Sequence, residues 1–103
     1  MTIIVLGHIR VAEGEGTKLR DLLVEHMAAT SAEDGCEFYN FAYDAADPDL
    51  IRVSERWASK EAIAAHGIAD HQKAFGKSLG AFGIKEISVK AWDGTFWQTL
   101  IGE

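Results

Sequence analysis

The spacing of apolar residues changes repeatedly along the 103-residue chain, and this feature limits the possible folds more than any other. Residues 3–11 are dense in β-branched side chains and stop at Glu13-Gly14-Glu15-Gly16, so they predict a strand followed by a turn. Residues 17–30 instead place apolar side chains three and four positions apart, which predicts an amphipathic helix. Glu33-Asp34-Gly35 closes this helix, because glycine adopts the left-handed conformation at the least cost.

Three more strands are predicted from alternation and turn residues. Residues 36–43 and 50–57 form two of them, separated by a turn at 44–49 that contains the only proline. A connection of about six residues indicates an antiparallel pair, because a parallel crossover needs a dozen or more. Residues 84–92 alternate apolar and polar side chains and predict the last strand, with Asp93-Gly94 as a turn.

Two helical pieces are predicted between the third and fourth strands. The first begins after a cap at Ser59 and ends at His66, Gly67 interrupts it, and the second covers residues 68–79. Three side chains of the second piece are expected to point inward: Ile68, Phe75 and Leu79.

The predicted order is β-α-β-β-α-β, which is an α+β, ferredoxin-like arrangement with helices on one face of an antiparallel sheet. The length suits one domain spanning residues 1–103. The first two strands are apolar on both faces and the tail contains Phe96 and Trp97, so the second face of the sheet needs a cover. A second copy of the chain is the simplest cover, which predicts a homodimer.

Composition excludes several classes of partner and cofactor. A net charge of −6 disfavours nucleic acids and anionic membranes, and no apolar run approaches the ~20 residues that cross a bilayer. The N-terminal residues show no signal or transit pattern, so a cytoplasmic location is expected. Cys36 is the only cysteine, which excludes an intramolecular disulfide and a cysteine-based metal site; we expect a buried apolar thiol in preference to a reactive one.

The histidines give weak signals by themselves. No glycine-rich phosphate loop is present, so a nucleotide cofactor has no support. His66 and His71 are five residues apart, about 140° around a helix, with Gly67 between them, so no metal site is expected. His26 lies on the apolar stripe of the first helix, which favours a hydrogen-bonded core residue over a catalytic one. His8 has no assigned role.

One carboxylate interrupts an otherwise apolar face of the third strand. Alternation puts Glu55 on the same face as Val53 and Trp57, so Glu55 is held by a structural hydrogen bond or serves a site. Trp57 and Phe75 are either plain core or the walls of a pocket for a flat ring. His66 lies near the helix break, and its ordinary titration range suits removal of a phenolic proton.

Two segments resemble a known family. Residues 55–66, continuing to 71–75, resemble the E-x-W…H…H segment of the antibiotic biosynthesis monooxygenase domain family, which includes small bacterial quinol monooxygenases. Residues 33–39 resemble its E-x-G-C-x-x-Y stretch. The resemblance implies a dimeric α/β barrel in which two sheets pack together and each protomer keeps its own pocket between helices and sheet.

The resemblance also implies a cofactor-independent monooxygenase acting on a small aromatic quinol, anthrone or polyphenol, with O2 as the second substrate. Related domains leave two alternatives open: an isomerase of a small, phosphorylated carbonyl compound, and a non-catalytic small-molecule-binding domain. Haem-degrading relatives carry a Trp where this chain has His66, which counts against haem.

The candidate site residues fall into two groups, in which His66, Trp57, Glu55 and His71 match family positions and the others are added from their places on the predicted strands and helix. The catalytic group implied is His66, Trp57 and Glu55. The substrate-binding group is His71, Phe75, Asn40 and Tyr39, although alternation can place Asn40 on the opposite face from Tyr39.

Overall fold

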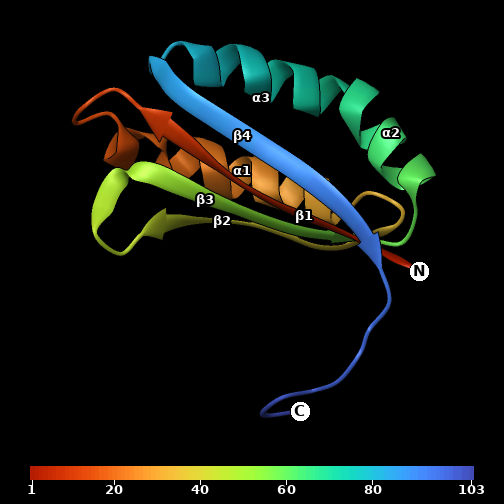
Figure 1. Cartoon of the computed structure of the whole chain (residues 1–103). Helices are drawn as coiled ribbons and strands as arrows, with labels where there is room; N and C mark the ends of the chain where they lie inside the picture. The colour runs from red at the N-terminus through yellow and green to blue at the C-terminus, as the bar shows by residue number, and fades with distance from the viewer.

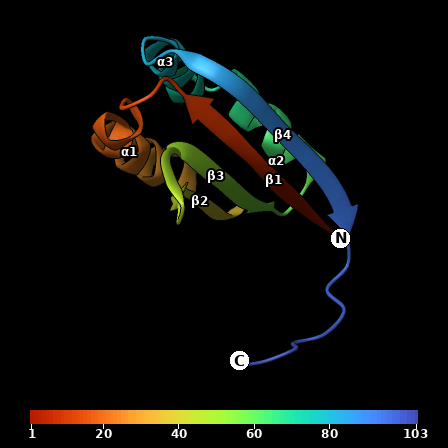
Figure 2. The ribbon, with the colours of Figure 1, turned by 60° about the vertical axis from the view of Figure 1, so that its left-hand side comes forward.

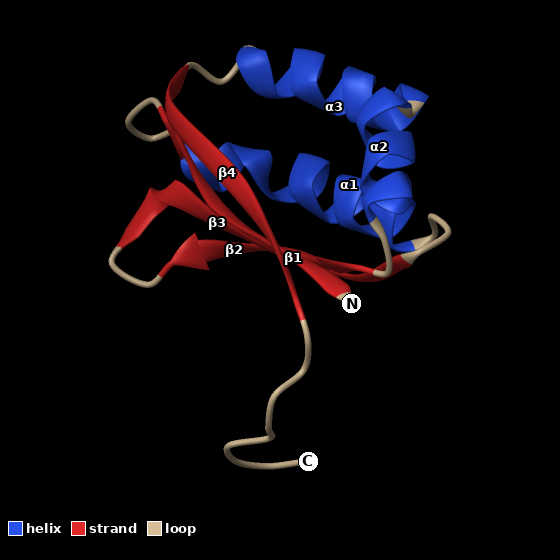
Figure 3. Ribbon diagram, turned by 45° about the vertical axis from the view of Figure 1, so that its right-hand side comes forward, coloured by secondary structure: helices blue, strands red, loops and turns tan.

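The computed structural model describes residues 1–103 and has the predicted order of elements (Figure 1). Four strands form one antiparallel sheet in the order β2-β3-β1-β4, and the helices cover one of its faces (Figure 3). The α+β, ferredoxin-like prediction is therefore confirmed. The elements are β1 (Thr2–Val11), a 3-10 turn η1 (Gly16–Leu19), α1 (Arg20–Ser31), β2 (Cys36–Asp44), β3 (Asp47–Trp57), α2 (Lys60–Ile68), α3 (Asp70–Gly80) and β4 (Ile84–Gly94).

The helices cover the two halves of the sheet differently. Helix α1 packs directly on β2, and its buried face includes Leu23, His26 and Thr30. Helix α3 packs more closely on α1 and α2 than on any strand. The space between α3 and the β1–β4 half of the sheet is therefore only partly filled, and this space contains the cavity described below.

Cross-strand rows define the face that the helices cover. Ile9 on β1 lies opposite Ile51 on β3 and Ile87 on β4, and Val5 lies opposite Glu55 and Ala91 in the same way. A side chain at Gly7 would collide with the backbone of Ser88 and Val89, so β4 can approach β1 this closely only over glycine. Odd-numbered positions of β1 thus face the helices, as alternation predicts.

The break between α2 and α3 lies two residues later than predicted. Gly67 is helical, and the extended backbone at Ala69 (ψ 143°) separates the two helices. Ile68 is the last residue of α2 and its side chain is 72% exposed, so the prediction that it points inward was wrong, whereas Phe75 and Leu79 are buried as predicted.

Two predicted turns differ from the structure: the first is shorter than predicted, and the second is absent. The connection between β2 and β3 is only Ala45-Ala46, because Asp47 already pairs with Asp44 of β2 and begins β3. Proline is tolerated at this position because it lies at the very start of the strand. Asp93 and Gly94 continue β4 instead of turning, since they pair with the first residues of β1.

The segments that follow α1 and β4 differ in conformation. Gly35 takes the left-handed conformation after α1, with φ +81°, as predicted. Residues 95–103 leave the end of β4 and extend away from the body of the molecule in each view (Figures 1 and 2). Their side chains are exposed; Trp97, for example, is 81% exposed. None of the helices is long and apolar enough to cross a membrane.

Candidate functional site

An apolar cavity of about 380 Å³ lies between α3 and the β1–β4 half of the sheet. Its volume falls in the range of small-molecule pockets. Most of the lining is apolar, and the polar groups are few. The residues that line it are Val5, Ile9, Tyr39, Phe41, Val53, Glu55, Ile63, His66, Gln72, Phe75, Leu79, Ile87, Val89, Lys90 and Ala91, with Gly76 at its helical wall.

Glu55 lies in the floor of this cavity, in the row that also contains Tyr39 and Val5. Burial raises the pKa of its carboxyl group, while the hydrogen bond from Trp57 acts in the opposite direction. Trp57 Nε1 donates that bond to Glu55 Oε1 at 2.8 Å. The carboxylate in the apolar row is therefore both anchored and in contact with the cavity, so the two interpretations left open by the sequence are compatible.

Trp57 itself does not line the cavity. Its side chain is 0% exposed and packs in the core, with its ring centroid 5.0 Å from that of His66. Trp57 can thus act on the site only through its neighbours, by fixing Glu55 and by supporting the imidazole of His66.

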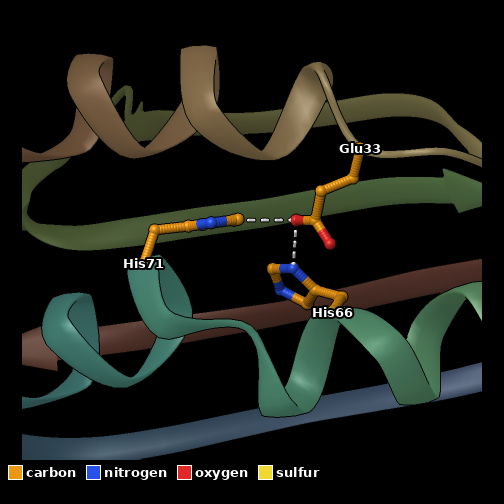
Figure 4. A group of neighbouring side chains, drawn as sticks. All are labelled: Glu33, His66 and His71. Carbon is orange, nitrogen blue, oxygen red and sulfur yellow. Dashed lines mark hydrogen bonds and ion pairs between the residues drawn. The ribbon is translucent and has the colours of Figure 1, made fainter.

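His66, Glu33 and His71 meet in one hydrogen-bonded cluster (Figure 4). Glu33 Oε2 is 2.7 Å from His66 Nδ1 and 2.8 Å from His71 Nε2. A carboxylate can only accept hydrogen bonds, so both ring nitrogens must be donors when Glu33 is ionised. Glu33 comes from the segment after α1, His66 from the end of α2 and His71 from the first turn of α3.

The cluster fixes the tautomer of His66. Its Nδ1–H donates to Glu33, which leaves Nε2 with a lone pair, and this second nitrogen points away from Glu33 in Figure 4. The His66 side chain is 8% exposed and lines the cavity. An imidazole whose Nδ1 is oriented by a partly buried carboxylate has the arrangement of a general base.

His71 lies on the other side of the cluster. It lines a separate groove of about 240 Å³ between α1 and α3, together with His26 and Phe75, and not the cavity. Its side chain is 34% exposed, so this histidine is the member of the cluster that faces solvent. The structure therefore brings His71 next to Glu33 but separates it from the space in which a substrate would lie.

His26 is a hydrogen-bonded core residue, as predicted. Its Nε2 lies 2.7 Å from Gln72 Oε1, and its ring stacks on Phe75 with centroids 3.9 Å apart. Burial lowers the pKa of His26 to about 4, so the ring is neutral at pH 7. This stack holds Phe75 in place, and Phe75 forms part of the wall of the cavity.

The remaining predicted residues divide between the two faces of the sheet. Tyr39 lines the cavity, and burial raises the pKa of its hydroxyl so that the group stays protonated. Asn40 lies opposite Ser54 on the other face of the sheet, so it does not join this group. His8 is also on that face, where its Nε2 is 2.6 Å from Glu86 Oε1. Cys36 is partly buried against the core, and burial raises the pKa of its thiol, as expected for an apolar cysteine.

Glu33 is the residue that sequence reasoning missed. It was read as part of the end of a helix, and its contact with His66 spans 33 residues of chain. The E-x-G-C stretch that contains it was the only signal available. The helix break at Ala69 was missed as well, and this break is what directs both histidines to one carboxylate, despite the unfavourable spacing that they would have on a continuous helix.

Comparison with known proteins places this geometry in context. A family model described as antibiotic biosynthesis monooxygenase matches residues 2–78. None of the curated proteins matches the chain. Solved structures do, at identities that show a shared fold alone.

A candidate antibiotic biosynthesis monooxygenase from Deinococcus radiodurans has a TM-score of 0.89 and 23% identity, and the match covers 97% of this chain and 99% of that one. Rv0793 from Mycobacterium tuberculosis has a TM-score of 0.83 and 21% identity, covering 96% and 100% of the two chains. PA3566 from Pseudomonas aeruginosa has a TM-score of 0.82 and 22% identity, covering 92% and 95%. The fold is therefore shared over nearly the whole length of this chain.

Proposed function

This chain belongs to the antibiotic biosynthesis monooxygenase family, and from that premise we propose that it is a cofactor-independent monooxygenase acting on a small aromatic quinol, anthrone or polyphenol. One observation carries the proposal: His66 lines an apolar cavity while Glu33 fixes its Nδ1, so Nε2 is available as a base. An apolar, partly enclosed space with one oriented base is what the deprotonation of a flat phenolic substrate requires.

The proposed reaction uses the substrate as its own reductant. His66 Nε2 takes a proton from the substrate, and the resulting anion transfers one electron to O2, which gives a substrate radical and superoxide. These combine to form a carbon–oxygen bond, and His66 returns the proton to the peroxide. Loss of water then leaves one oxygen atom in the product as a carbonyl group. With a simple quinol, transfer of a second electron and proton gives the quinone and hydrogen peroxide instead.

The other polar groups of the cavity have supporting roles in this proposal. Tyr39 keeps its proton and can donate a hydrogen bond to a substrate oxygen. Glu55, anchored by Trp57, presents its second oxygen to a substrate hydroxyl. Phe75 offers a rigid ring face, held by its stack on His26.

The phosphorylated-carbonyl isomerase is the weaker alternative, because the arginines expected to bind phosphate lie elsewhere. Arg10 pairs with Asp47 at 2.7 Å and Arg52 pairs with Asp44 at 3.1 Å. Both come from even-numbered positions, which face away from the helices and the cavity. Lys90 lines the cavity, but it lies opposite Leu6, so its side chain also faces the outer side of the sheet.

The proposal is tested by measuring oxygen uptake with a panel of reduced quinones and anthrones, in metal-free buffer without flavin. We expect the wild-type protein to accelerate uptake with at least one substrate. No acceleration with any member of the panel would contradict the proposed activity.

The cavity can be blocked without disturbing the core. A side chain at Gly76 would meet no atom within 4 Å at its Cβ, and Gly76 lies in the cavity wall. Gly76→Leu should therefore raise KM about tenfold or more while keeping or raising thermal stability, because glycine costs about 1 kcal/mol inside a helix. Gly80→Leu, at the end of the same helix and outside the cavity, is the matched control. Unchanged kinetics of Gly76→Leu would remove the cavity from the reaction.

We also propose that the protein is a homodimer joined through the outer face of the sheet. Leu6, Phe38 and Trp92 are exposed there, each by about half, and the aromatic tail extends beyond the body of the chain. Stable interfaces bury about 1,500 Å² or more, and we expect this face and the tail together to bury at least that area. Light scattering should give about twice the chain mass of 11.3 kDa. A mass of one chain at micromolar concentration would contradict the dimer.

A further inference from the structure

The cluster of Glu33, His66 and His71 combines two imidazoles and one carboxylate around a single point. Their donor atoms all lie within 4.8 Å of one another. On a continuous helix the two histidines would diverge, but the extended residue Ala69 turns α3 so that His66 and His71 both face Glu33 Oε2. Three separate segments of the chain thus hold the three donors in place.

The donor set selects one class of metal ion. Imidazole and carboxylate ligands suit divalent transition metals such as Zn²⁺ and Fe²⁺, whereas Mg²⁺ and Ca²⁺ prefer oxygen ligands alone. Two histidines and one carboxylate leave coordination positions for water or for the second oxygen of Glu33. We propose that Glu33, His66 and His71 bind one divalent transition-metal ion of the Zn²⁺ class, and that this ion switches off His66 as a base.

Metal binding and base catalysis demand opposite tautomers of His66. In the hydrogen-bonded cluster, Nδ1 carries the proton and Nε2 carries the lone pair. An ion at the centre of the cluster requires lone pairs on His66 Nδ1 and His71 Nε2, so the proton of each ring moves to its other nitrogen. His66 then presents N–H to the cavity and can no longer accept a proton. This inhibitory consequence rests on the proposed function, whereas the binding site does not.

The route to the site is separate from the cavity. His71 lines the groove between α1 and α3, where Glu25 adds a further negative charge. A cation can therefore reach His71 from solvent on the groove side, while His66 faces the cavity on the other side. The ion and the substrate accordingly approach the cluster from different directions.

The site is tested by titrating metal-stripped protein with Co²⁺ and following its visible ligand-field absorption, then displacing Co²⁺ with Zn²⁺. We expect one ion per chain. His71→Gln and Glu33→Gln should each weaken binding at least about tenfold, because even the loss of a supporting partner costs 10- to 100-fold. If Glu33→Gln fails to fold, Glu33→Asp is used in its place, because the shorter side chain keeps the charge but moves the carboxylate away from the two histidines. His8→Gln removes the exposed His8–Glu86 pair and should leave the titration unchanged.

Absence of stoichiometric Co²⁺ binding to the wild-type protein, or binding that survives both His71→Gln and Glu33→Gln, would overturn the site. The inhibitory part is tested by adding Zn²⁺ during oxygen uptake. Uptake should fall with the midpoint at which Zn²⁺ displaces Co²⁺ and return on chelation. Uptake that is unchanged or faster when the site is filled overturns the inhibition. If no substrate supports uptake, the proposed function fails, and the Co²⁺ titration still decides the metal site.

Discussion

The two halves of the sheet carry the same kind of inward-facing side chain but use it differently. Ile51 on β3 and Ile87 on β4 both lie opposite Ile9 in one cross-strand row. Ile51 is 0% exposed in the packed half next to α1, whereas Ile87 is 56% exposed at the wall of the cavity. The difference comes from the helices, because α1 packs directly on the sheet and α3 does not. A core and a pocket can thus arise from one row of residues.

The polar groups of the site lie between these two halves. Tyr39 on β2 and Glu55 on β3 belong to the packed half and line the cavity. His66 faces the cavity from the end of α2. Trp57, which holds Glu55 through a hydrogen bond, belongs to the packed core, as does the stack of His26 on Phe75. The packed half therefore supplies the rigidity that a positioned base requires, and the open half supplies the space.

The largest effect should separate the two isoleucines of the shared row. Ile51→Ala removes a fully buried side chain and should lower the free energy of unfolding by about 2–5 kcal/mol. Ile87→Ala removes a half-exposed one and should cost less than about 1 kcal/mol. Urea unfolding of both variants at equal protein concentration gives the two values. Equal losses would contradict the distinction between core and cavity wall.

The next effect concerns His26 in the packed half. Burial lowers its pKa to about 4 from an ordinary value of 6.5, so the unfolded chain binds this proton more readily than the folded chain does. Stability supplied by neutral His26 is complete above pH 6.5 and is lost as the pH falls toward 4, by on the order of 3 kcal/mol.

His26→Gln removes this titration, so its stability should depend less on pH than that of the wild-type protein between pH 6.5 and 4. Chemical unfolding of both proteins at several pH values, compared as a difference, isolates the effect of His26. Parallel stability curves would mean that the packed half does not exclude water from His26.

The smallest effect is at the boundary between the halves. Burial raises the pKa of Glu55, so its ionised form opposes folding at neutral pH. Glu55→Gln keeps an oxygen for Trp57 Nε1 and should raise the thermal midpoint slightly at pH 7. This gain should vanish as the pH falls through the raised pKa, where Glu55 is protonated in the wild-type protein. Glu61→Gln, an exposed change, is the control; a lower midpoint for Glu55→Gln at pH 7 would show that the carboxylate stabilises the fold.

The sequence predicted the parts of the structure that depend on local periodicity. Alternation was enough to place Glu55 and Trp57 on the helix-covered face of β3, and the helical spacing was enough to identify His26 as a core residue. These features follow from side-chain direction within one element and need no knowledge of its neighbours.

The features that the sequence did not predict depend on contacts between distant segments. Glycine is the expected helix breaker, yet Gly67 remains helical and Ala69 breaks the helix, because packing of α3 on α1 outweighs local propensity. Glu33 joins the site through side-chain contacts that no periodicity encodes.

The most direct test of the account is to measure oxygen uptake and thermal unfolding on the same sample of His66→Ala, with a substrate that the wild-type protein oxidises. If His66 is the base, turnover should fall by about 10²–10⁴-fold while the variant remains folded. His8→Gln, on the opposite face of the sheet, is the matched histidine control. Full turnover in folded His66→Ala, or a loss that only follows the unfolded fraction, would contradict the central claim.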